Sequence, residues 1–213
     1  MSLLFTAASS QYLSGGSAPV TADGVTIAGW FRPSSAAQSV VAAVGNATTG
    51  ARLQLWCQTT VVSASRANNS LTIVTSDSGG GNPTGVWVHC AATFEVSGGN
   101  VTAWRNGTAG TPVTNPGGAI TLNRFSIGAR FNGTSFGLFA DGDIAEVGVW
   151  SAILNADEIN SLAKGFPCRL VRPSALAEYS RLIRNPMDLR GGIALTNNNG
   201  ATASNHPRII HPC

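Results

Sequence analysis

Residues 139–159 constrain the fold of this chain more than any other part of the sequence. Asp141-Gly142 has the composition of a turn, and the residues that follow to Trp150 alternate as they do in a strand. On this pattern one strand face carries Ile144, Glu146 and Gly148, and the other carries Ala145, Val147 and Val149. Asn155 can then cap a helix in which Glu158 is the third residue. We therefore expect a turn, a closing strand and a short helical lid.

The rest of the sequence is typical of short strands joined by turns. Only 11% of the residues are charged, which disfavours a many-helix protein held by Glu–Lys pairs. Runs rich in β-branched and aromatic residues predict strands at 4–6, 11–13, 25–32, 39–44, 52–57, 60–63, 70–75, 86–94, 100–105, 119–122 and 124–128. Asn106-Gly107 and Asn132-Gly133 predict tight hairpin turns. This spacing indicates a β-sandwich or jelly roll.

Charge and hydropathy restrict the partners of the protein. The net charge of +3 is mild and the arginines are scattered, so we expect no nucleic-acid partner. No run of about 18 apolar residues occurs, and the first six residues lack the features of a secretion signal. We therefore expect no membrane partner and synthesis in the cytoplasm without a signal peptide.

The four cysteines show no CxxC spacing, and we expect them to be reduced packing residues. A disulfide between Cys168 and Cys213 remains open if the protein lives outside a cell.

The character of the sequence changes after Gly165. Residues 166–173 have an extended pattern, Ser174 can cap a short helix to about Arg181, and the remainder is rich in Pro, Asn, Gly and Arg. We therefore expect a domain of residues 1–165 and a C-terminal arm of residues 166–213. The arm cannot bury its own apolar residues, so it should lie against the sandwich or another subunit.

Three blocks stand in a recognisable order: residues 26–33, then residues 87–94 with 101–107, and last residues 127–130 followed by 139–159. Together they resemble the concanavalin A-like, laminin G-type jelly roll over about residues 3–165. The resemblance implies an all-β, two-sheet jelly-roll sandwich with one short helix, followed here by the extended C-terminal arm.

The arm has a resemblance of its own. Gly165-Phe166-Pro167, Val171-Arg172-Pro173, Leu176, Tyr179, Leu182 and His206-Pro207 resemble laminin G-like proteins encoded in tailed-phage and prophage genomes. This implies a virion structural protein, a capsid decoration or tail appendage, made in the host cytoplasm and located in the virion. It would attach to other virion proteins through its arm and form a homo-oligomer. The residues assigned to assembly are Arg169, Arg172, Tyr179, Ile209 and Ile210.

A lectin-like module that binds a host surface glycan is the alternative hypothesis. Sugar binding needs exposed aromatic side chains. Trp30, Trp87 and Trp150 lie in the blocks that resemble core strands, and Phe131, Phe136 and Phe139 surround a predicted loop rim. The residues assigned to glycan or partner contact are Trp56, Trp104, Phe131 and Phe136.

An enzyme is disfavoured. Glycan hydrolases of similar fold need two carboxylates that face one glycosidic bond, usually at i and i+4 on a strand. Glu146 has no second acid at that spacing, and Asp143, three residues away, would point to the opposite face. His89 lies in an apolar run and is expected to be a packing residue. We therefore expect no catalytic residue.

Calcium is the one cofactor left open. The resemblance implies a rim of Asp and Asn oxygens, which suit a hard cation. Asp141 and Asp143 are the candidate ligands, with Asp23 or Asn132 as loop partners. The acidic residue frequent in the middle of the family's Ile-Asp-Glu is Ala145 here, so we expect no cofactor as the default.

Overall fold

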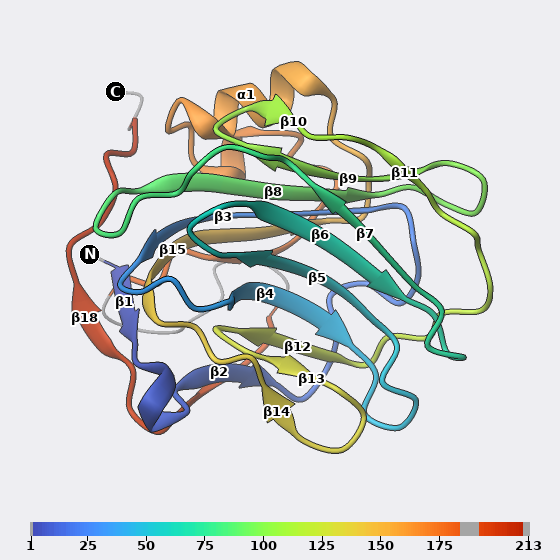
Figure 1. Ribbon diagram of the computed structural model, residues 1–213, viewed down its shortest axis with the longest axis horizontal. Helices are drawn as coiled ribbons and strands as arrows, with labels where there is room; N and C mark the ends of the chain where they lie inside the picture. Colours follow the sequence, from blue (N-terminus) through green and yellow to red (C-terminus); the bar gives the residue numbers. More distant parts are fainter. Residues whose placement is uncertain (1, 184–191, 211–213) are drawn as a thin grey trace.

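The computed structural model describes residues 2–183 and 192–210. Within these residues two antiparallel sheets stack as a sandwich, and a small hairpin lies beside them (Figure 1). The all-β jelly roll expected from the sequence is confirmed. The described residues contain no helix that is long and apolar enough to cross a membrane.

The first sheet, sheet A, has the order β10-β9-β8-β3-β15-β1-β18, with β11 beside β9 and β16 beside β15. Its strands are β1 (Ser2–Phe5), β3 (Val25–Pro33), β8 (Val88–Phe94), β9 (Asn100–Arg105), β10 (Thr108–Ala109), β11 (Val113–Thr114), β15 (Gly142–Trp150), β16 (Leu176–Ser180) and β18 (Thr202–Ser204).

The second sheet, sheet B, has the order β17-β2-β12-β4-β5-β6-β7. Its strands are β2 (Tyr12–Gly15), β4 (Ser39–Gly45), β5 (Arg52–Cys57), β6 (Val62–Ala67), β7 (Ile73–Asp77), β12 (Arg124–Ile127) and β17 (Leu195–Asn198). The small hairpin pairs β13 (Arg130–Phe131) with β14 (Phe136–Gly137), and the helical segments are η1 (Ala7–Ser9), α1 (Ala156–Ala163) and η2 (Cys168–Leu170).

The core lies between the sheets. The longer strands of both sheets contribute apolar side chains to it, among them the fully buried Phe31, Phe94 and Phe125. Burial of one such ring contributes about 1.5–3 kcal/mol, so these side chains fix which face of their strands points inward. The strands predicted at residues 52–57 and 100–105 coincide with β5 and β9. The strand predicted at 119–122 is absent, because those residues form an irregular connection before β12.

Strand β15 departs from the expected alternation at Glu146. A β-bulge lies between Ala145 and Gly148, and Glu146 has a φ of +53°. As a result Ile144 and Val147, three residues apart, both pack in the core. The prediction that Ile144, Glu146 and Gly148 share one face is therefore wrong, because the bulge adds a residue to the strand.

Helix α1 begins as the sequence predicts. The Asn155 side chain accepts a hydrogen bond from the Glu158 backbone N–H at 3.0 Å, and the Glu158 carboxylate accepts one from the Asn155 N–H at 2.8 Å. The helix buries Ile159 and Leu162 against Trp150 on the outer face of sheet A. This capping box and apolar stripe fix the lid over that sheet.

The described part of the C-terminal arm, called the tail from here on, belongs to both sheets. β16 pairs with β15, β17 with β2, and β18 with β1. The short helix predicted from Ser174 to about Arg181 is wrong, because Leu176–Ser180 pairs with β15 as a strand. A register shift in this pairing lets Leu176 and Tyr179, three residues apart, both pack in the Trp150 cluster. The expectation that the arm lies against the sandwich holds for residues 166–183 and 192–210, which supply strands to it.

A pair of leucines in the tail tests this packing. Leu176→Ala should lower the free energy of unfolding by about 2–5 kcal/mol, because the side chain is 3% exposed in the Trp150 cluster. Leu170→Ala is the control, since that side chain is 44% exposed, and it should change stability by less than about 0.5 kcal/mol. Urea unfolding followed by tryptophan fluorescence measures both, and equally small effects would contradict the packing.

Candidate functional site

The β13–β14 hairpin folds back over the outer face of sheet B. Gly128, with a φ of +79°, turns the chain after β12, and the Ser126 hydroxyl then donates to the Ala129 carbonyl oxygen at 2.7 Å. At Gly45 of β4 a Cβ would lie 3.6 Å from the Phe131 carbonyl oxygen. The hairpin therefore contacts β4 at a residue that has no side chain, and it lies next to β12 (Figure 1).

Four aromatic rings gather on this face. Tyr12 points outward from β2, because its neighbour Leu13 lies in the core. Its ring centroid is 4.2 Å from that of Phe136 and 5.8 Å from that of Phe139, while the Phe131 and Phe136 centroids are 5.0 Å apart. All four rings are half-buried. We call Tyr12, Phe131, Phe136 and Phe139 the aromatic platform.

The structure separates the two tryptophans assigned to surface contact. Trp56 is half-buried on the outer face of sheet B, because Leu55 and Cys57 on either side of it enter the core. Trp104 lies on sheet A, where it packs against the Trp150 cluster and its indole N–H donates to Thr93 Oγ1 at 3.3 Å. Trp56, Phe131 and Phe136 therefore share a face that Trp104 does not reach.

Sequence reasoning missed three arginines on the same face. Arg52 is 7% exposed, and its Nη1 donates to the Gly50 carbonyl oxygen at 3.0 Å. The Arg124 guanidinium lies 4.9 Å from the centre of the Phe131 ring, and Arg130 Nη1 donates to Gln54 Oε1 at 3.4 Å. Burial and the nearby Arg130 charge lower the pKa of Arg52 to about 10, and burial lowers the pKa of Arg130.

Three of the four candidate calcium ligands have other partners. Asp143 is buried in an ion pair with Arg32 at 2.8 Å, and Asp23 binds Arg66 at 2.7 Å. The Asn132 side chain accepts hydrogen bonds from the backbone N–H groups of its own loop. Asp141 lies beside Asp143 at the start of β15. Among the described residues no group of three or more His, Cys, Asp or Glu side chains is arranged to hold a metal ion.

Glu146 holds the tail on sheet A rather than facing a groove. Its buried carboxylate accepts a hydrogen bond from the Tyr179 hydroxyl and lies 3.6 Å from Arg181 Nε and 3.2 Å from His206 Nε2. Burial raises the pKa of the Tyr179 hydroxyl, and the Cys168 and Glu146 charges raise it further. All three partners come from the tail, so the bulge in β15 is a docking point for it.

The described cysteines agree with the expected packing role. Cys57, Cys90 and Cys168 are buried and form no disulfide with a described residue. Burial, followed by the Glu146 charge, raises the pKa of the Cys168 thiol. The alternative disulfide of Cys168 involves Cys213, which lies outside the described residues.

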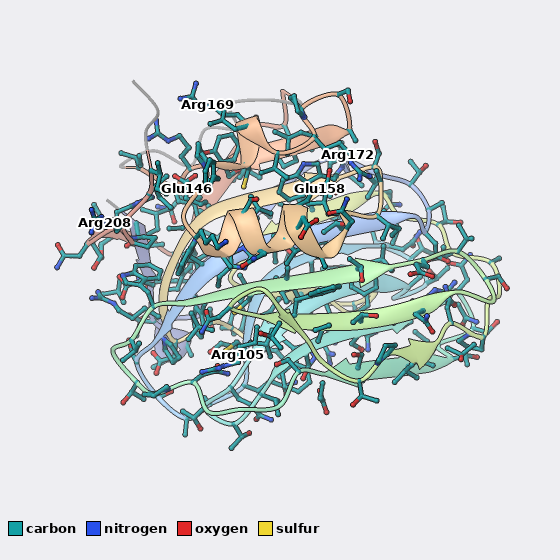
Figure 2. All side chains as sticks on the ribbon, turned by 90° about the horizontal axis from the view of Figure 1, so that it is seen from above. Arg105, Glu146, Glu158, Arg169, Arg172 and Arg208 are labelled. Atoms are coloured by element: carbon teal, nitrogen blue, oxygen red, sulfur yellow. The ribbon has the colours of Figure 1, made fainter. Side chains whose placement is uncertain are left out.

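The residues assigned to assembly are divided between interior and surface. Tyr179 is buried, and Arg172 binds Glu158 through Nε at 2.8 Å and Nη2 at 2.6 Å beside α1 (Figure 2). Arg169 and Ile210 are exposed, and Ile209 is half-buried. Next to the Arg172–Glu158 pair lies a pocket of about 400 Å³ whose walls include Phe166 and Leu170. This part of the tail therefore presents both apolar and cationic groups.

His89 packs as the sequence indicated. Its ring is buried in edge contact with Trp30, with 5.4 Å between the ring centroids. Its Nδ1 has no hydrogen-bond partner among the described residues. Burial lowers the pKa of His89 to about 3, so the imidazole is neutral near pH 7. Trp30 and Trp87, expected in the core, are instead half-buried, and only Trp150 among the three is fully enclosed.

The two-sheet sandwich is of the concanavalin A-like class. Residues 7–160, more than half of the chain, match the family model described as the concanavalin A-like lectin/glucanases superfamily. The chain belongs to this superfamily. No curated protein sequence matches it.

Solved structures show the same fold. A heptameric SAP-like pentraxin from Limulus polyphemus has a TM-score of 0.67 at 12% identity, over 90% of this chain and 87% of its own. A putative carbohydrate-binding protein from Bacteroides ovatus has a TM-score of 0.65 at 16% identity, over 96% of this chain but 61% of its own. The CBM40 domain of a Ruminococcus gnavus sialidase, bound to α2,3-sialyllactose, has a TM-score of 0.57 at 17% identity, over 67% of this chain and 83% of its own.

The buried histidine predicts a pH dependence of stability. Unfolded His89 takes up a proton near pH 6.5, whereas the native residue does so only near pH 3. The native state therefore binds fewer protons than the unfolded state. The contribution of His89 to stability is fully present above about pH 6.5 and is lost as the pH falls toward 3. The slope for one such group is about 1.4 kcal/mol per pH unit.

The measurement is the free energy of unfolding at pH 6.5 and pH 5 for the wild type and His89→Leu. The wild type should lose about 2 kcal/mol more than the variant over this interval. Comparing slopes removes the pH dependence that both proteins share through their carboxylates. Equal slopes would contradict the depressed pKa.

Proposed function

We propose that this protein is a non-enzymatic carbohydrate-binding module that holds a glycan on the aromatic platform. The observation that carries the proposal is the gathering of Tyr12, Phe131, Phe136 and Phe139 on an outer sheet face. These four rings lie outside the core of the sandwich. Sugar rings have apolar C–H faces, which pack on aromatic side chains, while their hydroxyls need polar neighbours.

The platform is arranged in advance of binding. Tyr12 and Phe136 contact each other, and Arg124 stacks on Phe131, so these rings lose little freedom when a ligand arrives. Gln54 and the half-buried Trp56 lie on the same face of β5. A sugar at the platform would therefore meet aromatic rings together with the half-buried guanidinium of Arg124.

The comparisons support this proposal through proteins of the same fold. The Bacteroides ovatus structure is described as a putative carbohydrate-binding protein, and the Ruminococcus gnavus domain was solved with α2,3-sialyllactose. A non-enzymatic role is supported by the carboxylates of β15. Asp143 is paired with Arg32 and Glu146 is enclosed by tail residues, whereas glycoside hydrolysis needs two carboxylates that face one bond.

A glycan array followed by calorimetry tests the platform. Phe136→Ala should weaken binding of any glycan found by about tenfold or more, because it removes the ring at the centre of the cluster. Phe166→Ala is the control, since this ring is 39% exposed in the tail, and it should leave affinity unchanged. Binding that survives Phe136→Ala undiminished would overturn the platform as the site.

Attachment to a virion is the second candidate function. In this proposal the protein is a capsid decoration or tail appendage that contacts other virion proteins and copies of itself through its tail. It is supported by the exposed apolar residues Phe166, Leu170 and Ile210. Beside them Arg169 and Arg208 form no ion pair with any described residue (Figure 2).

Surface substitutions test attachment better than truncation, because the tail supplies β16, β17 and β18 to the sheets. A Leu170→Asp, Arg169→Glu double variant should reduce incorporation into particles at least about tenfold, since it reverses both the apolar and the cationic character of the surface. Quantitative mass spectrometry of purified particles measures this. Phe136→Ala is the control and should be incorporated normally; normal incorporation of the double variant would exclude attachment through this surface.

A further inference from the structure

Three arginines on the outer face of sheet B have no carboxylate partner among the described residues. In the pairing register Arg52 lies opposite Gly45, and Gly45 lies opposite Arg124, so the two arginines flank the glycine over which the hairpin passes. Arg130 reaches the same face from β13 and contacts Gln54, two residues along β5 from Arg52. None of the three forms an ion pair with a described residue.

The same protein neutralises the arginines that it buries for structural reasons. The fully buried Arg66 binds both oxygens of Asp23 and the carbonyl oxygens of Gly117 and Gly118. Arg32 pairs with Asp143 in a similar way. A buried charge without such partners is costly, so structural arginines are expected to have them.

Arg52 and Arg124 differ from these structural arginines. Arg52 is more than nine-tenths buried, yet its one described hydrogen bond goes to a backbone carbonyl, and its Nε has no partner among the described residues. Arg124 also has a buried Nε without a partner, and its guanidinium rests on an aromatic ring. A guanidinium has five donors, so each of these two side chains keeps donors that no described residue accepts.

When like charges lie close together on a partly buried face, the charged form of each group is disfavoured. The depressed pKa of Arg52 has burial as its main cause and the Arg130 charge as its second. An anion placed among the three groups would offset their mutual repulsion and accept hydrogen bonds from the unused donors. Guanidinium groups bind carboxylates and sulfate-type oxyanions in charge-assisted pairs, which are stronger than neutral hydrogen bonds.

We propose that Arg52, Arg124 and Arg130 form a subsite for the anionic group of an acidic glycan, a carboxylate or a sulfate ester, whose sugar ring lies on the aromatic platform. This inference rests on the proposed carbohydrate-binding function and names its ligand class. Arg124 joins the two parts of the site, because the same side chain contacts Phe131 and belongs to the arginine group. A free inorganic anion would need the arginines but not the rings.

Matched acidic and neutral sugars test the subsite. The probes are α2,3-sialyllactose against lactose, hexagalacturonate against its methyl ester, and a chondroitin sulfate hexasaccharide against desulfated, methyl-esterified chondroitin. At least one acidic probe should bind about tenfold or more tightly than its neutral counterpart. In ¹⁵N-labelled protein, its titration should also shift the side-chain Nε–H resonances of Arg52 and Arg124.

Variants assign the preference to these residues. Arg130→Gln should remove the preference for the acidic probe, and Arg124→Lys should retain part of it. Arg169→Gln carries the same charge change on the exposed tail and should leave the preference intact. Raising the salt concentration from 50 to 500 mM should weaken only the acidic probes.

The outcomes separate this inference from the function on which it rests. Equal affinity for acidic and neutral probes, or no binding of any acidic probe, overturns the arginine subsite. If a neutral probe binds equally well and its binding is lost in Phe136→Ala, the platform is supported without the arginine subsite. Acidic binding that is lost in Arg130→Gln but unaffected by Phe136→Ala supports the subsite and overturns the platform.

Discussion

The buried carboxylate of Glu146 determines how the tail joins the sandwich. A charge in the interior is stable only with partners of its own, and removing one partner of such a group typically costs about 3–5 kcal/mol. Tyr179, Arg181 and His206 all approach this carboxylate from the tail. The backbone contributes as well, because the Glu146 N–H donates to the Arg181 carbonyl oxygen at 3.3 Å. Forming β16 beside β15 therefore satisfies Glu146 and covers Trp150 at once.

The outer faces of the two sheets are covered by different means. On sheet A, α1, η2 and β16 enclose an apolar cluster around Trp150. On sheet B the cover is a short hairpin that passes over Gly45 and leaves its aromatic rings half-buried. A sealed face can contribute only to stability, whereas a partly covered one can also bind. The candidate site is therefore on sheet B.

Local signals in the sequence predicted much of the fold. The Asn106-Gly107 turn adopts positive φ at both residues, and the Asn155–Glu158 capping box starts α1 as expected. The bulge at Glu146 was not predictable from alternation, and the residues that bind the Glu146 side chain lie more than 30 positions away in the sequence. The strand at β16 was missed for a related reason: its apolar residues face a cluster built from other segments.

The candidate site was only partly accessible to sequence reasoning. Aromatic residues around Asn132-Gly133 indicated a platform, but Trp56 and Trp104 have similar surroundings in the sequence and lie on different sheets. Arg52 and Arg124 meet through strand register with β4, and Arg130 joins them from the hairpin, neither of which composition reveals. Likewise Asp143 looked available as a ligand until the pairing of β15 with β3 placed it beside Arg32.

Both ends of the described chain lie on the layer of sheet A. Ser2 begins β1 in that sheet, and the N–H of Ile210 donates to the carbonyl oxygen of Gly165, just after α1, at 2.7 Å. The aromatic platform lies across the sandwich, on the outer face of sheet B. A tether at either end would therefore join the molecule at the layer of sheet A, whereas the platform belongs to the other layer. Many copies fixed in this way on one surface would present parallel sites, so a weak interaction at each site would add up to strong collective adhesion.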